Sequence, residues 1–192
     1  MTKSIKGTKT EQNLLKAFAG ESQARQRYTL YAAKARCEGY DQIAAIFEET
    51  ALNEQYHGRR FFSYLEGGMV EITASYPAGI VGTTMQNLAE AAEGEYDEWS
   101  NLYPGFAEVA AEEGFPQVAA AFKVILEVEK VHEKRYRKLL ENIKEGHVFK
   151  KESVVNWKCR ECGFVYEGTE APKVCPSCLE KQEVFELQCI NY

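Results

Sequence analysis

Four segments of the chain carry a glutamate in the apolar stripe that a helix turns toward a protein core. Glu21 stands seven residues after Leu14 and seven before Tyr28. The same spacing places Glu54 between Phe47 and Phe61, Glu95 between Leu88 and Leu102, and Glu129 between Phe122 and Tyr136. Seven residues are nearly two helical turns, so each glutamate lies on the same face as its apolar neighbours. A bundle of these helices therefore directs four carboxylates into its interior.

Such a cluster of carboxylates requires compensating positive charge. The chain has 27 Glu among 192 residues, and a single Glu on a helix is usually solvated. Four in register inside a bundle are different, because an isolated buried carboxylate costs several kcal/mol and neighbouring carboxylates repel one another. No segment places a Lys or Arg in the same stripe. Protons or bound cations are the remaining ways to make the cluster stable.

Two histidines indicate that the cation is a metal. The motif Glu-x-x-His occurs at Glu54–His57 and at Glu129–His132, and residues three apart are neighbours on a helix surface. Glu21 precedes the first motif by 33 residues and Glu95 precedes the second by 34, so the pattern is an internal repeat. One lone Glu and one Glu-x-x-His in each helical hairpin is the ligand set of ferritin-like di-iron carboxylate proteins. Carboxylates with two imidazoles suit iron or manganese.

Helical periodicity and helix-ending residues predict four helices in a first domain, residues 1–148. They span about residues 8–37, 41–67, 84–113 and 116–145, with a kink expected at Pro104. Short connections join the first pair and the last pair, which is typical of antiparallel hairpins, whereas residues 67–83 are long enough to cross over. The predicted fold class is mainly α, a ferritin-like four-helix bundle with a long crossover between helices 2 and 3.

A small second domain, residues 149–192, follows the bundle. Its β-prone runs are Val154–Lys158, Phe164–Tyr166 and Val184–Leu187. Trp157, Tyr166 and Phe185 are expected to form a small aromatic core. Because a domain this short cannot bury enough apolar surface to fold alone, it needs a covalent or metal crosslink.

Four of the six cysteines supply that crosslink as two Cys-x-x-Cys knuckles. They are Cys159, Cys162, Cys175 and Cys178. In a reducing compartment such clusters bind metal more often than they form disulfides. The spacing alone favours a structural zinc ribbon, whereas the residues around each knuckle resemble a rubredoxin site, which holds iron. Cys37 and Cys189 fit neither knuckle and are interpreted as structural or incidental thiols.

Composition excludes several classes of partner. A net charge of −6 and a pI near 5.3 provide no basic surface for a nucleic-acid backbone. No stretch approaches the roughly 18 apolar residues of a membrane helix, and the N-terminal residues have no apolar export segment. We therefore expect a cytoplasmic protein without nucleic-acid or membrane partners.

The order of motifs resembles the rubrerythrin family along essentially the whole chain. The matching residues are Gly20-Glu21-Ser22-Gln23-Ala24, both Glu-x-x-His motifs, Gly94-Glu95-x-x-Glu98 and both cysteine knuckles. The resemblance implies a di-iron centre in which Glu54 and Glu129 bridge the irons and Glu21 and Glu95 are terminal ligands. It also implies that His132 binds the second iron, while His57 and Glu98 alternate on the other as the centre changes oxidation state.

The resemblance extends to the second domain and to the assembly. It implies one iron held by the four cysteines and a homodimer, in which this iron lies nearer the di-iron site of the other subunit. Leu179 departs from the pattern, because free rubredoxins commonly have Gly after the last knuckle.

The predicted function is reduction of hydrogen peroxide to water. Electrons would enter through the four-thiolate iron from an external donor, such as a rubredoxin or an NAD(P)H-dependent reductase. His57, Glu98, Tyr28 and Tyr103 are the candidate catalytic residues, the last three as a proton relay. Two alternatives remain open: a ferroxidase that handles iron and has a zinc tail, and a scaffold that its metals only stabilise.

Overall fold

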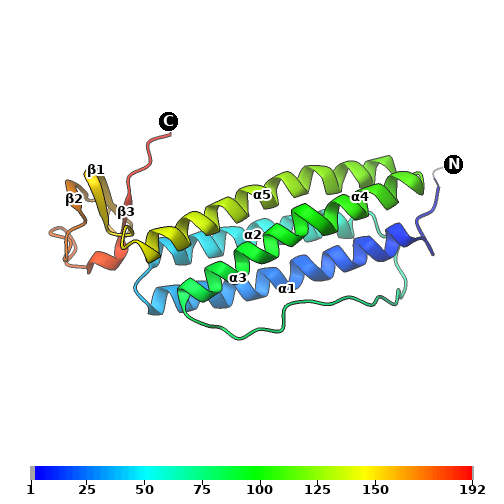
Figure 1. Ribbon diagram of the computed structural model, residues 1–192, viewed down its shortest axis with the longest axis horizontal. Helices are drawn as coiled ribbons and strands as arrows, with labels where there is room; N and C mark the ends of the chain where they lie inside the picture. Colours follow the sequence, from blue (N-terminus) through cyan, green and yellow to red (C-terminus); the bar gives the residue numbers. More distant parts are fainter. Residues whose placement is uncertain (1–2, 192) are drawn as a thin grey trace.

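The computed structural model describes residues 3–191. Its helices are α1 (Lys9–Cys37), α2 (Asp41–Phe62), α3 (Thr84–Asp97), α4 (Tyr103–Glu112) and α5 (Pro116–Lys144). A π-helical turn, η1 (Glu98–Leu102), joins α3 to α4 without a break. α3, η1 and α4 act as one long helix, so the bundle has four members (Figure 1). The predicted ferritin-like bundle is confirmed. Among the described residues no helix is long and apolar enough to cross a bilayer.

Local signals at the helix ends agree with the sequence prediction, with one exception. Thr8 caps α1, since its side chain accepts a hydrogen bond from the Glu11 N–H at 3.1 Å. Gly39 and Gly114, both with positive φ, follow the ends of α1 and α4. α2 ends at Phe62, earlier than the predicted end near residue 67, because the chain turns at residues 63–64 and leaves the bundle.

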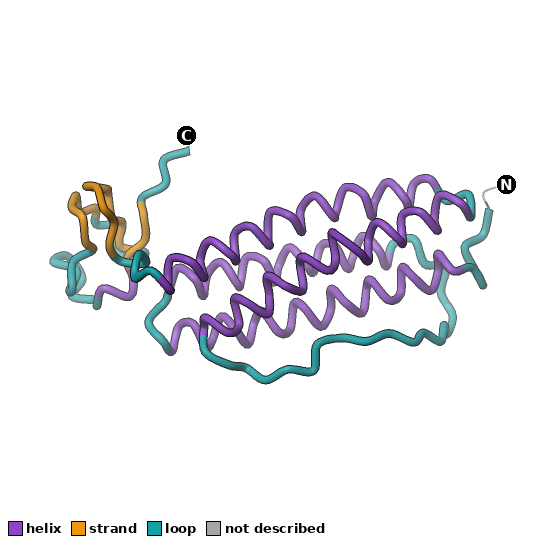
Figure 2. The backbone as a smooth tube through the Cα atoms, viewed as in Figure 1, coloured by secondary structure: helices purple, strands orange, loops and turns teal. Residues whose placement is uncertain are grey.

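The connection between α2 and α3 is the predicted crossover. Residues 63–83 contain no helix or strand and run along the length of the bundle beside α1 (Figure 2). The Tyr76 hydroxyl fastens this segment by donating a hydrogen bond to the Lys16 carbonyl at 2.7 Å. Thr83 and Gln86 form a capping box that starts α3 at the far end. α2 and α3 consequently run parallel, as in ferritin-like folds.

The π-turn changes which residue faces the core beyond Glu95. A π-turn has one residue more than an α-helical turn. Here the Tyr103 N–H donates a hydrogen bond to the carbonyl of Glu98, five residues earlier. The predicted core position Leu102 is 37% exposed, so that prediction is wrong, and Tyr103, which is 2% exposed, takes its place. Pro104 follows directly and has no N–H to donate. Where the sequence predicted a kink at Pro104, the helix therefore contains this π-turn.

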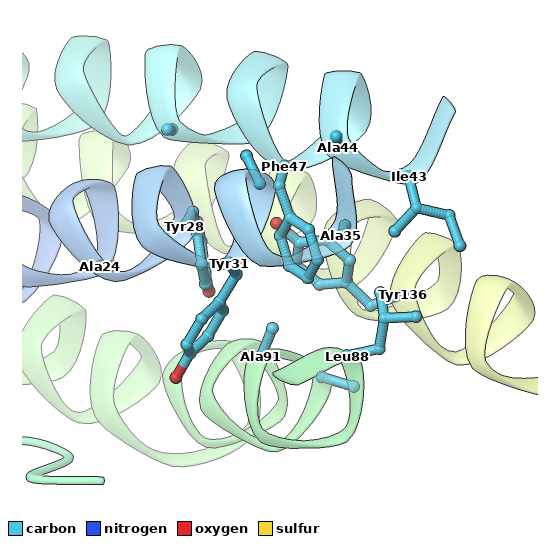
Figure 3. Packing of buried hydrophobic residues seen from close by; sticks show 13 residues of the cluster. Ala24, Tyr28, Tyr31, Ala35, Ile43, Ala44, Phe47, Leu88, Ala91 and Tyr136 are labelled. Carbon is cyan, nitrogen blue, oxygen red and sulfur yellow. The ribbon is translucent and has the colours of Figure 1, made fainter. Parts of the chain in front are cut away.

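Two apolar clusters fill the bundle, one toward each end. The cluster nearer the small sheet contains Tyr28, Tyr31, Phe47, Leu88 and Tyr136, whose rings and side chains meet between the helices (Figure 3). The other cluster contains Leu14, Phe61, Tyr103, Val118 and Phe122. The glutamates of the four apolar stripes lie between the two clusters, because each is flanked in sequence by members of both.

The C-terminal domain is a three-stranded antiparallel sheet with order β2-β1-β3. The strands are β1 (Lys150–Cys159), β2 (Val165–Glu170) and β3 (Phe185–Leu187), and a 3-10 turn, η2 (Gln182–Val184), precedes β3. Trp157 and Phe185 form the core as predicted, at 0% and 1% exposed. The prediction for Tyr166 is wrong, because this residue is 41% exposed. Tyr166 pairs with Trp157, but it lies on the edge strand β2, and its ring lies over Gly168 at the margin of the sheet.

The sheet domain contacts the end of the bundle where α1 turns into α2 (Figure 1). The rings of Tyr40 and Phe149 are parallel, with centroids 6.4 Å apart. The Arg160 guanidinium, one residue after the first knuckle cysteine, donates to Asp41 Oδ2 at 2.9 Å. This ion pair links the cysteine cluster to the first turn of α2.

Candidate metal centres

Six side chains of the sequence motifs converge inside the bundle. They are Glu21 from α1, Glu54 and His57 from α2, Glu95 from α3, and Glu129 and His132 from α5. The four carboxylates are at most 1% exposed. Their donor atoms form two groups, each with all atoms within 4.8 Å of one another: Glu21, Glu54, His57 and Glu129 in one, and Glu54, Glu95, Glu129 and His132 in the other. The two groups share Glu54 and Glu129.

The shared carboxylates each point one oxygen at each histidine. Glu54 Oε2 lies 2.9 Å from His57 Nδ1, and Glu54 Oε1 lies 3.3 Å from His132 Nδ1. Glu129 Oε1 lies 2.9 Å from His57 Nδ1, and Glu129 Oε2 lies 2.8 Å from His132 Nδ1. This is the arrangement expected of two carboxylates that bridge two adjacent metal positions.

Unpartnered polar atoms test whether metal ions fit here. Both oxygens of Glu54 and of Glu129, and Nδ1 of His57 and of His132, are buried and make no hydrogen bond within the described chain. Glu21 Oε2 and Glu95 Oε2 are likewise buried and make no hydrogen bond within the described chain. Burying so many polar atoms without partners is costly. Cations among these converging oxygen and imidazole donors would satisfy them all, and the donor set suits iron or manganese.

Tyrosines hold the outer oxygens of the two unshared carboxylates. The Tyr103 hydroxyl donates to Glu21 Oε1 at 2.5 Å, and the Tyr28 hydroxyl donates to Glu95 Oε1 at 2.6 Å. Each unshared carboxylate is thereby fixed in orientation and keeps one oxygen free to face the centre. The arrangement is nearly symmetric between the two hairpins.

Asn53, which belongs to none of the sequence motifs, breaks that symmetry. Its Oδ1 lies 3.3 Å from His132 Nε2, on the side of the ring away from the carboxylates. The His132 side chain is 3% exposed, whereas that of His57 is 12% exposed. His132 is therefore the better anchored of the two imidazoles. The position of Asn53 next to Glu54 is the sequence signal that could have identified it.

The pKa values show how the histidines and carboxylates of the cluster act on one another. Burial lowers the pKa of His132, but the carboxylates of Glu129 and Glu54 outweigh it and raise the pKa to about 12. Burial favours a higher pKa for Glu129, but the His132 and His57 imidazoles lower it to about 2. Burial and the charge of Glu54 raise the pKa of Glu95 to about 8. With these pKa values His132 and Glu95 hold protons at neutral pH, and metal binding would release them.

Glu98 lies beside this cluster and is not part of either donor group. It is half-buried at the start of the π-turn and lines a cavity that also touches Tyr103. Burial and the charges of neighbouring carboxylates, Glu95 foremost, raise its pKa well above the usual range. The predicted ligand is therefore close to the centre but turned toward the cavity.

The four knuckle cysteines form the second centre. Cys159 Sγ lies 3.7 Å from Cys178 Sγ, and Cys162 Sγ lies 3.7 Å from Cys175 Sγ. A tetrahedral site with metal–sulfur bonds of about 2.3 Å has sulfur–sulfur edges of about 3.8 Å, so the thiols fit a tetrahedral ion. Cys159 and Cys175 are buried, whereas Cys162 is exposed. One edge of this centre therefore faces solvent.

The fold and the two centres define a helical-bundle metalloprotein with a carboxylate-bridged two-metal site and a separate four-thiolate site. The family model for rubrerythrin matches residues 12–140, and that for the rubredoxin-like domain of rubrerythrin matches residues 157–186. The chain belongs to the rubrerythrin family.

Individual relatives extend the similarity over the full chain. Rubrerythrin of Porphyromonas gingivalis is 56% identical over 192 residues, covering 100% of this chain and 96% of its own. Rubrerythrin-1 of Clostridium acetobutylicum is 57% identical over 195 residues, and the match covers 99% of this chain and 100% of that protein. The structure of fully reduced, all-ferrous nigerythrin aligns with a TM-score of 0.63 and 30% identity over 96% of this chain and 92% of that one.

These similarities assign the two centres. The bundle carries the Glu/His di-iron site of the family, and the C-terminal domain carries the four-cysteine cluster of a rubredoxin-like domain. The protein is an iron-dependent oxidoreductase.

Proposed function

We propose that this protein reduces hydrogen peroxide to water, with electrons supplied through the four-thiolate iron of its C-terminal domain. The observation that carries the proposal is the presence, in one chain, of a buried carboxylate-bridged site and a thiolate site with one exposed edge. The chemistry that bound iron supplies is two-electron cleavage of the O–O bond, in which hydrogen peroxide, two electrons and two protons become two water molecules. A ferroxidase would not need the thiolate centre.

The side chains of the chain itself would hold the two irons. Glu21, Glu54, Glu95, Glu129 and His132 would hold the two irons, with Glu54 and Glu129 shared between them. His57 and Glu98 would exchange at one position: His57 is the more exposed imidazole, and Glu98 lines the cavity between α1 and the α3–α4 helix.

Protons would reach the site through side chains that contact the ligand carboxylates or border the cavity. Tyr103 lines the cavity and donates a hydrogen bond to Glu21, and Glu98 lines the same cavity. Tyr28 donates the corresponding hydrogen bond to Glu95 from the bundle interior, outside the cavity. We assign these three side chains to the proton relay.

Electron delivery favours a dimer over a single chain. The sheet domain contacts α2 at Asp41, and Glu54 lies 13 residues further along α2, which at 1.5 Å per residue is about 20 Å. Electron tunnelling slows exponentially with distance, so transfer within one chain would be inefficient. A head-to-tail homodimer would bring the thiolate centre of one subunit to the di-iron site of the other. An external rubredoxin or NAD(P)H-dependent reductase would deliver electrons at the exposed Cys162 edge.

The domains we propose are residues 1–148 and 149–192, acting in the cytoplasm, where thiolates stay reduced. The test starts from anaerobically reduced protein that is mixed with one equivalent of peroxide or of oxygen. We expect rapid oxidation of both iron centres by peroxide, much slower oxidation by oxygen, and loss of peroxidase turnover in Cys162→Ser. Cys37→Ser, an exposed thiol outside the cluster, is the matched control. A colourless zinc-containing tail in active protein would refute the electron-transfer part.

A further inference from the structure

Two helical glycines stand directly before the unshared carboxylates. Gly20 precedes Glu21 on α1, and Gly94 precedes Glu95 on α3. Glycine weakens a helix interior relative to alanine, so its use requires a reason. Close packing is not the reason for these glycines. A Cβ atom at Gly20 would lie 3.6 Å from its nearest neighbouring atom, and a Cβ atom at Gly94 would lie 3.8 Å from its own, and both distances are ordinary van der Waals contacts. At Gly58, by contrast, a Cβ would lie only 3.3 Å from the Cβ of Glu21.

Both glycines line the same cavity. It has a volume of about 300 Å³ and lies between α1, the α3–α4 helix and the crossover. Its inner wall includes Glu98 and Tyr103, and Tyr103 donates to Glu21 at 2.5 Å. The cavity therefore ends at side chains that contact or border the di-iron ligands.

The crossover closes the outer side of this cavity. Residues 73–77 line it, and the Tyr76 ring lies 3.6 Å from the position of a Gly20 Cβ. The Tyr76 hydroxyl donates to the Lys16 carbonyl at 2.7 Å, while 37% of the residue is exposed to solvent. Tyr76 thus stands between the cavity and solvent, on a segment without helix or strand.

We propose that this cavity is the path by which small molecules reach the di-iron site, that Gly20 and Gly94 keep it open, and that Tyr76 limits the size of what enters. For peroxide as the entering molecule the proposal rests on the proposed function. The path itself concerns any small ligand of the irons. A side chain at Gly94 would occupy the space beside Glu98, and removal of the Tyr76 ring would widen the entrance.

Azide binding tests the path without any catalytic turnover. Oxidised, iron-loaded protein is mixed with azide, and the second-order binding rate constant is followed by the absorbance change of the di-iron site. We expect Gly94→Leu to bind azide about tenfold more slowly than wild type and Tyr76→Ala to bind it faster. Gly105→Leu is the matched control, since Gly105 lies on α4 outside this cavity and a Cβ there would meet nothing within 4 Å.

If Gly94→Leu does not fold, Gly94→Ala provides the test. An alanine Cβ at this position makes only ordinary van der Waals contact, so the variant should fold, and we expect it also to lower the rate constant of azide binding. Equal azide rate constants in wild type, Gly94→Ala and Tyr76→Ala, at equal iron content, would overturn the path. Slower binding in the Gly94 variants together with faster binding in Tyr76→Ala supports it.

A second measurement addresses the entering substrate. The ratio of the rate constants for tert-butyl hydroperoxide and hydrogen peroxide should rise in Tyr76→Ala, because the bulkier peroxide gains more from a wider entrance. An unchanged ratio would refute the size limit assigned to Tyr76. If no variant and no wild-type protein reduces any peroxide, the proposed function fails, and the azide rates still decide the path.

Discussion

Replacing Glu54 with leucine should stabilise the metal-free protein and abolish its stabilisation by iron. Glu54 is 1% exposed, and neither of its carboxylate oxygens has a hydrogen-bond partner in the described chain. Glu54→Leu therefore removes one of several mutually repelling buried acids, while Glu129 Oε1 and Oε2 remain 2.9 and 2.8 Å from Nδ1 of His57 and of His132. Replacing a whole buried ion pair by well-packed apolar groups is often stabilising by about 1–4 kcal/mol, and because Glu129 keeps both imidazoles paired, we expect a gain at the low end of this range. For a chain of this size that corresponds to roughly 2–4 °C in Tm for each kcal/mol.

Thermal unfolding of chelator-treated protein, followed by far-UV circular dichroism, measures this difference. Glu54→Gln isolates the loss of charge at nearly constant volume. Glu127→Leu is the surface control, since the Glu127 side chain is 64% exposed, and a change within about 0.5 kcal/mol is expected there. With ferrous ion at about 100 times its Kd, wild type should gain about 2.7 kcal/mol, whereas Glu54→Leu should gain little from the bundle site.

Two results would show the reasoning to be wrong. One is a lower Tm for metal-free Glu54→Leu than for metal-free wild type. The other is an equal rise in Tm for both proteins on adding iron, because the bundle site would then not depend on a shared carboxylate.

Further predictions concern residues around the centres and at the helix ends. Glu113 accepts hydrogen bonds from the first two N–H groups of α1, at 3.2 and 2.8 Å, so Glu113→Gln should cost about 1 kcal/mol at pH 7 in urea unfolding. Hydrogen bonds to that end of α1 lower the pKa of Glu113, so its contribution is complete above the unfolded pKa near 4.3 and is lost as the pH falls through the lower folded pKa; a difference that persists at low pH would contradict this. Tyr28→Phe leaves Glu95 Oε1 without its donor and should weaken iron binding about 10–100-fold in a chelator competition, and unchanged affinity would exclude an orienting role. Leu179 has φ +66°, so Leu179→Gly should raise the stability of the C-terminal domain by about 1–2 kcal/mol, and a destabilised variant would show that the Leu179 side chain matters more than its backbone strain.

Features encoded by local periodicity were predictable from the sequence. The bundle, the four inward carboxylates and the two knuckles follow from spacings of seven and three residues, which a helix or a knuckle converts directly into proximity. The crossover follows from the length of the connection between the second and third helices. The structure brings together the six donors of the bundle and the four cysteines. Their roles in catalysis stay predictions.

Features that depend on distant partners were not predictable. The π-turn shifts the register of the third helix by one residue, so the inward position fell on Tyr103 and not on Leu102. Tyr166 was assigned to the small core, but it lies on an edge strand, and the order of the strands in the sheet depends on partners distant in the sequence. Asn53 reaches His132 across the bundle, and no spacing within α2 signals a contact to α5.

Because Glu54 and Glu129 belong to both donor groups, the two iron positions are not independent. The first ion to bind fixes both shared carboxylates and neutralises part of their repulsion, so the second ion meets a site that is already arranged for it. Filling should therefore be cooperative, and protein given half the iron it needs should separate into empty and fully loaded molecules, with few that hold a single ion.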